Sequence, residues 1–297
     1  MIEYTKKTLQ SLKDFNIKDE REVGIAALSS VRFDKKNLIE RGEVNINTYA
    51  QYMYNSQYNH FWDPDRNLHV LISKSYDTSR NNIRYFLDEN FTILHRDDGP
   101  AALTLNQSNR VISFGWVKNG ILHRDENLPQ EVCSNPYSGS PNVEKILYMK
   151  NGHGHRLDGP SKVYFSHSGF FSGFFNTINW EQEGKLHNLN GPSLITFSHH
   201  WKNGFTSIRS ILFYKNNKRH KLDGPALLEF NYNENLIRSI YYVNGKRLDR
   251  RKFPYMKDGK IYGRVLKHRG LLMKAALFDR EYGQFLRENI NPDLLEK

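Results

Sequence analysis

Five histidines recur along the middle of the chain at nearly constant intervals. They lie at His95, His123, His155, His187 and His220, with spacings of 28, 32, 32 and 33 residues. Imidazole is a common metal ligand and general base, so the set raises the question of a metal or catalytic site. Such a site requires unlike side chains that converge on one point. Here one residue type returns in one local sequence, which instead indicates one histidine in each unit of an array.

The sequence around each histidine defines the repeat. The copies are LHRDDGPAALTL from Leu94, LHRDENLPQEV from Leu122, GHRLDGPSKVYF from Gly154, LHNLNGPSLITF from Leu186, RHKLDGPALLEF from Arg219 and the degenerate KRLDRRKF from Lys246. Neighbouring units of a meander lie two strand spacings apart, so successive histidines would be about 10 Å apart, whereas zinc holds its ligands at about 2 Å. We therefore expect no catalytic, cofactor or metal site. We expect His and Arg to hydrogen-bond the turn carbonyls and the Asp. The residues assigned to the structural repeat are His95, Gly99, Pro100, His155, Gly159, Pro160, His187, Gly191, Pro192, His220, Gly224 and Pro225.

Two turn signals mark the elements that carry these residues. An aromatic residue precedes an Asn-Gly-like turn in WVKNGI at Trp116, YMKNGH at Tyr148, WEQEGK at Trp180, YKNNKR at Tyr214 and YVNGKR at Tyr242. Asn-Gly accepts the positive φ of both central residues of a type I′ turn, which predicts a β-hairpin. In Asp-Gly-Pro, we expect glycine to supply an unusual backbone angle and proline to precede a strand. Strands joined by short turns pair antiparallel.

The sequence thus predicts a mainly β protein. Its centre is an antiparallel β-meander of about 30-residue repeats, with a small α+β N-terminal domain and a C-terminal helix. The regions expected are 1–75 for the N-terminal α+β domain, 76–253 for the β-repeat domain, and 254–297 for a basic segment with the C-terminal helix. Only 38% of residues are hydrophobic, but 18 Phe and 17 Tyr are present, which suits thin sheets. The single cysteine, Cys133, excludes an intrachain disulfide and favours a reducing compartment.

The copies resemble the Asp-Gly-Pro-Ala repeats, relatives of MORN repeats, in proteins of large DNA viruses and bacteriophages. The shared motif is His-Arg-x-Asp-Gly-Pro-Ala after an aromatic-x-x-Asn-Gly strand end, over roughly Leu94 to Asp249. Copies two and six depart from it, with Asn127-Leu128-Pro129 and Asp249-Arg250-Arg251 in place of Asp-Gly-Pro. The resemblance implies a scaffold or interaction role and a viral or phage origin. The chain's size and layout are also similar to those of phage inhibitors of the Gabija defence complex.

Aromatic side chains gather near the N-terminus. They include Tyr49, Tyr52, Tyr54, Tyr58 and Trp62. They would form the core of the N-terminal domain, or a partner-binding surface, because Tyr and Trp are enriched at interface hot spots. Apolar spacing predicts a helix over Tyr4–Phe15.

A basic segment lies near the C-terminus. From Lys246 to Lys274 there are eleven Lys and Arg against two Asp, a net charge of +9, whereas the whole chain carries +11. Candidate partner-binding residues there are Arg250, Arg251, Lys252, Lys257, Lys260 and Arg264. Such a segment would grip nucleic acid, dock on an acidic protein, or be merely solvated.

Helical spacing follows the basic segment, over Arg264–Asn289. The apolar residues assigned to oligomerisation are Leu271, Leu272, Phe278, Tyr282 and Phe285. This apolar face would pack on the last strand of the sheet or on another copy of the chain.

We expect a non-enzymatic, self-assembling interaction protein, virus- or phage-encoded, that binds a protein complex of host or virus. It would inhibit a host anti-phage defence complex or serve as a virion accessory component. The alternative is a nucleic-acid-binding protein that uses residues 246–274. The first ten residues lack the apolar stretch of a signal peptide, and no run approaches the roughly 20 apolar residues of a membrane span. We therefore expect a soluble protein with no membrane contact in the cytoplasm, that of the host cell if the source is viral.

Overall fold

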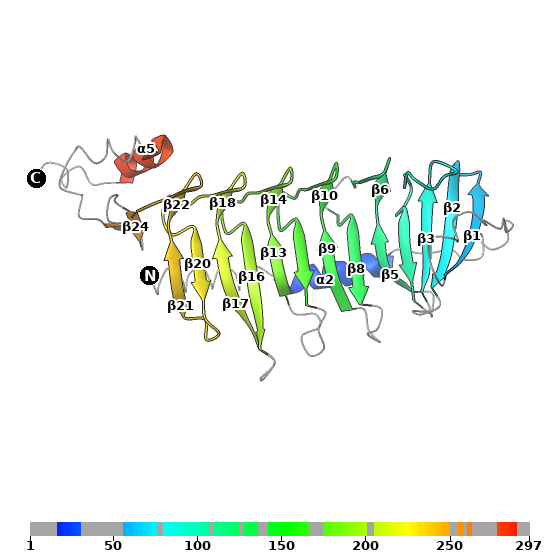
Figure 1. The fold of residues 1–297 in the computed structure, drawn as a ribbon, viewed down its shortest axis with the longest axis horizontal. Coiled ribbons are helices and arrows are strands. Elements are labelled where there is room, and N and C mark those ends of the chain that lie inside the picture. The colour runs from blue at the N-terminus through cyan, green and yellow to red at the C-terminus, as the bar shows by residue number, and fades with distance from the viewer. Residues whose placement is uncertain are drawn as a thin grey trace, which may run out of the picture. The chain divides into compact units, whose positions relative to one another are not determined.

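The structure is a computed structural model. It describes residues 17–30, 56–75, 80–106, 110–124, 128–135, 142–166, 175–200, 205–249, 255–257, 260–262 and 278–289. Within these residues, thirteen antiparallel strands form one sheet whose spatial order follows the chain order (Figure 1). They are β1 (Ser56–Asp63), β2 (Leu68–Ser75), β3 (Asn81–Phe86), β4 (Ala102–Leu105), β5 (Val111–Gly115), β8 (Glu131–Asn135), β9 (Asn142–Leu147), β12 (Lys162–Phe165), β13 (Phe175–Asn179), β16 (Leu194–His200), β17 (Phe205–Leu212), β20 (Leu227–Phe230) and β21 (Leu236–Ile240). The predicted β-meander is confirmed.

Two compact units make up the chain: Lys18–Phe175, and Asn176–Lys297 together with Met1–Ile17. Strands β1 and β2 come from the region expected to form the N-terminal domain. β2 nevertheless pairs with β3 across the expected boundary at residue 75, for example through Ile72 opposite Ile83. These two strands therefore belong to the sheet.

An apolar row takes one residue from each of ten strands, β3 to β20. In the first unit the register joins Ile83, Leu103, Phe114, Val132, Ile146 and Val163. In the second unit it joins Ile178, Ile195, Ile211 and Leu228. All of these side chains are at most 3% exposed. Each burial contributes about 1.5–3 kcal/mol, so the row favours the observed register of the strands that contribute to it.

Short hairpins follow every second strand of the repeat. They are β6 (Val117–Lys118) with β7 (Ile121–Leu122), β10 (Met149–Lys150) with β11 (His153–Gly154), β14 (Glu181–Gln182) with β15 (Lys185–Leu186), β18 (Tyr214–Lys215) with β19 (Lys218–Arg219), and β22 (Tyr242–Val243) with β23 (Lys246–Arg247). Both central residues of every one of these turns have positive φ, from 48° to 83°. The predicted type I′ turns at Asn119-Gly120, Asn151-Gly152 and Asn244-Gly245 are confirmed.

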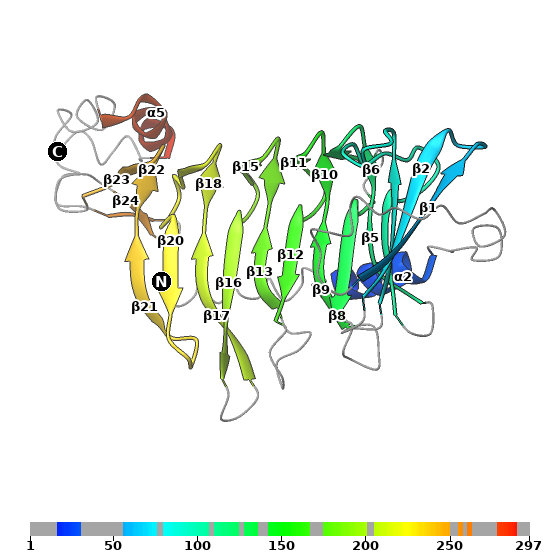
Figure 2. The same cartoon turned by 45° about the vertical axis from the view of Figure 1, so that its right-hand side comes forward.

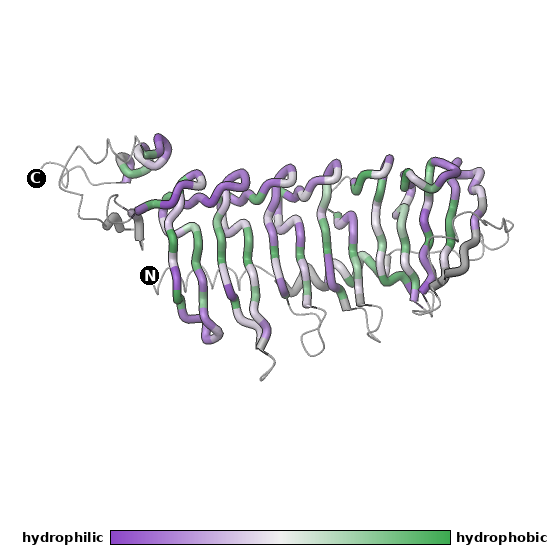
Figure 3. Tube along the Cα trace, viewed as in Figure 1, coloured by the Kyte–Doolittle hydropathy of each residue, from purple (hydrophilic) through white to green (hydrophobic). Residues whose placement is uncertain are grey.

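The hairpins of a unit project from the same side of its strands, and those from β10–β11 onward are largely hydrophilic (Figures 1 and 3). We call the row of these turns the hairpin ridge. It consists of β6–β7 and β10–β11 in the first unit, and of β14–β15, β18–β19 and β22–β23 in the second. One more hairpin, β24 (Tyr255–Lys257) with β25 (Lys260–Tyr262), follows the ridge in sequence.

A helix that the sequence analysis missed, α2 (Ile17–Ser30), packs on the first unit (Figure 2). Its contact residue is Gly24, where a Cβ atom would lie 2.8 Å from Cδ1 of Ile146. Leu28, one turn later, is 4% exposed. The glycine therefore allows the helix backbone to approach β9 closely. The helix expected over Tyr4–Phe15 lies outside the described residues.

The second helix, α5 (Arg280–Asn289), packs on the last repeat of the second unit. Tyr282 and Leu286 are at most 1% exposed in a cluster with Tyr241, Val243 and Leu248. Of the two expected uses of the apolar helix face, packing on the chain's own β-structure is the one observed. Neither described helix is long and apolar enough to cross a bilayer.

Candidate binding surface on the repeat hairpins

Four of the five repeat histidines form a hydrogen bond with the next hairpin. The Nδ1 atom of each faces the backbone N–H of the first turn residue, which has positive φ. The donor–acceptor pairs are Asn119 to His95 at 3.1 Å, Asn151 to His123 at 3.3 Å, Asn216 to His187 at 3.3 Å and Asn244 to His220 at 3.1 Å. At His95, His123 and His220 an accepting Nδ1 requires the neutral tautomer with its proton on Nε2. At His187 the shorter contact of Nδ1 is to Oδ1 of Asn216, at 2.8 Å, where Nδ1 is the donor. The histidines thus connect successive hairpins.

A backbone bond accompanies each histidine contact. The carbonyl before the histidine accepts from the second turn residue of the next hairpin, as from Gly120 to Leu94 at 2.8 Å and from Gly245 to Arg219 at 2.8 Å. The backbone N–H of the histidine donates to the backbone carbonyl of the aromatic residue at the end of the preceding strand. These pairs are His95 to Tyr85, His123 to Trp116, His155 to Tyr148, His187 to Trp180 and His220 to Phe213, at 2.9–3.2 Å. The aromatic positions of the last two hairpins are therefore Phe213 and Tyr241, not the Tyr214 and Tyr242 expected from the sequence.

The basic residue after the histidine stacks on that aromatic ring. The distances to the ring centroid are 4.4 Å for Arg96 on Tyr85, 4.3 Å for Arg124 on Trp116, 3.9 Å for Arg156 on Tyr148 and 4.0 Å for Lys221 on Phe213. The same cations reach the Asp of Asp-Gly-Pro, as with Arg96 to Asp98 at 2.6 Å and Arg156 to Asp158 at 2.9 Å. Each stack contributes about 0.5–2 kcal/mol.

The glycine of Asp-Gly-Pro makes room for this cation. A Cβ atom at Gly159 would lie 2.8 Å from Cζ of Arg156, and one at Gly99 would lie 2.7 Å from Cζ of Arg96. Neither glycine has positive φ. The expectation that this glycine supplies an unusual backbone angle is therefore wrong. Lack of a side chain, and not backbone freedom, selects glycine here.

The expected bonding of the repeat is confirmed for arginine and needs correction for histidine. Arginine reaches both the Asp and the turn carbonyls, as in Arg124 to the Pro129 carbonyl at 3.1 Å. Histidine serves mainly as an acceptor for the next hairpin, and His95 also contacts its own Asp97, at 3.1 Å. In the described part of the chain, no group of three His, Cys, Asp or Glu side chains is placed to hold a metal ion. Burial raises the pKa of the Cys133 thiol.

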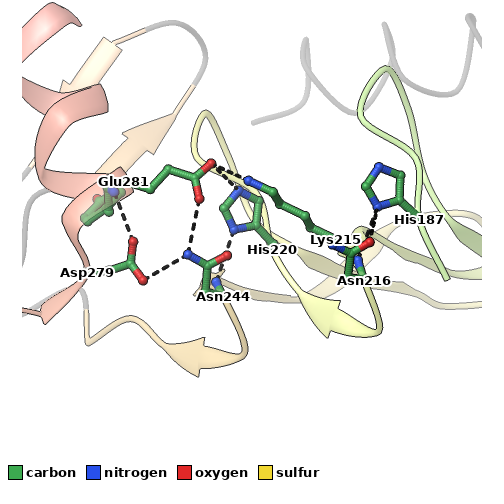
Figure 4. A network of polar contacts seen from close by, with 8 residues as sticks. His187, Lys215, Asn216, His220, Asn244, Asp279 and Glu281 are labelled. Carbon is green, nitrogen blue, oxygen red and sulfur yellow. Dashed lines mark hydrogen bonds and ion pairs between the residues drawn. The ribbon is translucent and has the colours of Figure 1, made fainter. Parts of the chain in front are cut away.

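The C-terminal helix brings carboxylates onto the ridge (Figure 4). Glu281 accepts from Lys215 Nζ at 2.8 Å and from Asn244 Nδ2 at 3.2 Å, and it lies 3.7 Å from His220 Nε2. Asp279 caps the helix, since its carboxylate accepts from the N–H of Tyr282 at 3.1 Å and from Asn244 Nδ2 at 3.0 Å. Burial lowers the pKa of His220, against the opposing charge of Glu281.

The candidate residues in the basic segment fall largely outside the described residues. Arg250, Arg251, Lys252, Arg264, Leu271 and Leu272 are not described. Lys257 and Lys260 lie on β24 and β25, and nothing further is described of their side chains. Phe278 and Phe285 are partly buried against the cluster that holds Tyr282.

Among the N-terminal aromatic candidates, only Trp62 has a described side chain. Tyr49, Tyr52 and Tyr54 are not described, and Tyr58 is placed on β1 only by its backbone. Trp62 is 42% exposed and lies edge-on to His69, with ring centroids 4.7 Å apart. His69 also stacks on His60 at 5.2 Å. The exposed ring of Trp62 thus borders a small aromatic cluster on β1 and β2.

Two repeated leucines in the segments between the hairpins and Gly-Pro were missed by the sequence analysis. Leu157 and Leu189 occupy the same position, two residues after the histidine, and each is 72% exposed. The equivalent Leu222 instead packs against the α5 cluster. The signal was present in the sequence as a leucine in a turn that carries no other apolar residue before Gly-Pro.

Comparison with known proteins adds no assignment. No family model matches the chain, and no curated protein matches it.

Proposed function

We propose that this chain is a non-enzymatic, self-assembling interaction protein, encoded by a virus or phage, that binds a protein complex. One observation carries the proposal: the repeated polar side chains are engaged within the array. The histidines hold one hairpin to the next, and the arginines bond to the Asp of their own Asp-Gly-Pro turn. They therefore serve a scaffold, which leaves the hairpin ridge and the exposed Leu157 and Leu189 to meet a partner.

The partner is proposed to be a host anti-phage defence complex, which the protein inhibits, or a virion to which it is an accessory. The resemblance to viral and phage Asp-Gly-Pro-Ala repeats supports this origin. Affinity capture from host lysate, before and after nuclease treatment, tests it. We expect a stoichiometric protein complex that persists after nuclease treatment. Recovery of nucleic acid alone, or of no complex, would refute the proposal.

Self-assembly is supported by the ends of the sheet. In the described part of the chain, β1 and β21 each pair on one side only, which leaves backbone groups available to another strand. Near the β21 edge, Ile237 is 65% exposed and Tyr232 is 72% exposed. We propose a homo-oligomer with contacts from residues 246–297 and this edge. Sedimentation over a range of concentrations tests it, and a monomer at every concentration would contradict it.

Nucleic-acid binding remains the second candidate because the hairpin ridge is basic. Lys150, Lys185, Lys218 and Lys246 are exposed on its hairpins, and the +9 segment follows. Phosphate contacts make affinity fall steeply with salt. Fluorescence anisotropy with a duplex at several salt concentrations separates the candidates, because apolar protein contacts do not weaken in this way.

A further inference from the structure

The last repeat of the second unit holds an acidic helix start. The segment Phe278–Tyr282 contacts this repeat at four positions. The histidine is His220, 3.7 Å from Glu281, and the leucine is Leu222, packed against the α5 cluster. The turn asparagine is Asn244, which donates to both Asp279 and Glu281. The turn lysine is Lys246, whose Nζ donates to the Phe278 carbonyl at 2.9 Å.

The preceding repeat of the same unit presents all four residue types again. They are His187, Leu189, Asn216 and Lys218, which we call the Leu189 site. His187 faces Asn216 as His220 faces Asn244, with the same Nδ1 atom toward the turn N–H. The hairpin backbone is also the same, since Asn216 and Asn244 have φ values of 50° and 48°. The two sites therefore share their residue types and their hairpin backbone.

The Leu189 site differs in being uncovered within the described part of the chain. Leu189 is 72% exposed, whereas Leu222 is partly buried. Asn216 uses its Oδ1 atom toward His187 at 2.8 Å. Its Nδ2 atom, and Nζ of Lys218, have no ion pair or hydrogen bond with the described residues, whereas the equivalent atoms of Asn244 and Lys246 are all engaged by the α5 segment.

We propose that the Leu189 site binds the acidic start of a helix in a partner protein, in the way that the neighbouring repeat binds Phe278–Tyr282. The ligand has an apolar side chain that packs on Leu189, and carboxylates in its first turn that accept from Asn216 and Lys218. This proposal rests on the proposed function as a protein-binding scaffold. One position departs, because Gln182 replaces Lys215, the ion-pair partner of Glu281. Lys218 and the exposed Lys185 supply the positive charge instead.

A peptide of residues 278–289 is the probe. A short helix is marginal in water, so a lactam bridge should hold it, formed with loss of water between Glu288 and a lysine introduced by Gln284→Lys. Gln284 and Glu288 are exposed on the side of the helix that faces away from the sheet, with Nε2 and Oε1 2.9 Å apart, so the bridge leaves the docking face intact. Fluorescence anisotropy with the full chain should show saturable binding. D279N/E281Q in the peptide, and Leu189→Asp or Lys218→Glu in the chain, should each raise Kd by about tenfold or more.

Leu157→Asp is the matched control. Leu157 is equally exposed at the same repeat position, but the turn of the following repeat begins with Glu183, an acid where the Leu189 site has asparagine. This variant should leave Kd unchanged. No binding, or equal binding to wild type and Leu189→Asp, would overturn the proposal. If the chain binds the peptide but captures no complex from lysate, the proposed function alone is refuted. If the chain does not bind the peptide, and Leu189→Asp captures the complex as well as wild type does, this inference alone is refuted.

Discussion

Replacement of His220 by alanine tests the role assigned to the histidines. The N–H of Asn244, which is half-buried, loses its acceptor, and an unsatisfied group of this kind costs about 1–3 kcal/mol. The imidazole is only 10% exposed, so its removal also leaves a void, which brings the expected loss of unfolding free energy to about 2–4 kcal/mol. At His187 the corresponding N–H belongs to the exposed Asn216, and water replaces the acceptor. His187→Ala should cost only about 0.5–1.5 kcal/mol.

The same variant should remove a pH dependence. Burial lowers the pKa of His220 below its usual 6.5, although Glu281 and Asp279 oppose the shift and Lys215 adds to it. The unfolded chain therefore binds the proton more readily than the folded chain. The contribution of His220 to stability is fully present above about pH 6.5 and is lost as the pH falls toward the folded pKa. Protonation at Nδ1 would place a donor against the Asn244 N–H, which agrees with this direction.

Urea unfolding followed by circular dichroism at pH 7.5 and 5.5 measures both effects. Wild type should lose more stability between the two pH values than His220→Ala does. Burial and His69 also lower the pKa of His60, but this residue is present in both proteins and cancels in the difference. Equal costs for His220→Ala and His187→Ala, or equal pH dependence in wild type and His220→Ala, would refute the reasoning.

Two further substitutions address the turns. Gly159→Ala places a Cβ atom 2.8 Å from Cζ of Arg156, so the cation must leave its ring, and we expect a loss of about 1–2 kcal/mol in thermal or urea unfolding. Gly191→Ala meets only Asn188 Nδ2, at 3.3 Å, and should cost less; the reverse order would contradict the packing role of the glycine. Glu183 has a φ of 49°, a conformation that asparagine adopts more readily, so Glu183→Asn should raise stability by about 0.5–1 kcal/mol, and a lower urea midpoint would count against this account.

Local signals allowed the fold to be predicted from the sequence. Asn119-Gly120 dictates its turn through backbone angles alone, so the hairpin positions follow without knowledge of the partner strand. The role of Gly159 could not be found in this way, because it depends on where the Arg156 side chain lies in space. The aromatic position of the fourth hairpin was misassigned because Phe213 and Tyr214 are adjacent and either suits a strand end. The hydrogen bond from His220 to the Phe213 carbonyl and the stack of Lys221 on the Phe213 ring distinguish them.

The helices show the same division. α2 was missed because its contact with the sheet is made by Gly24 and Leu28, too narrow an apolar face to give a clear helical period. The helical tendency of α5 was visible, but its partner was not, since a periodic apolar face does not reveal what covers it. The Leu189 site could not be predicted from the sequence, because it is identified by comparison with the repeat on which α5 packs. Leu189 is exposed and the equivalent Leu222 is covered, a difference that only the structure reveals.

The packing of α5 predicts how the chain should respond to loss of its last contact. Leu286 is fully buried against Tyr241, Val243 and Leu248, positions at the end of the last repeat. Leu286→Ala should weaken this contact by about 2–5 kcal/mol. In repeat arrays stability is carried by neighbour contacts, so the loss should stay local to the end that the helix covers. Hydrogen exchange should show lower protection over Tyr241–Leu248 and unchanged protection over β8 and β9 in the other unit. Gln284→Ala, on the exposed side of the same helix, should change neither region. A uniform loss across all strands would mean that the sheet unfolds as one cooperative body, and no loss at Tyr241–Leu248 would mean that α5 does not act as a cap.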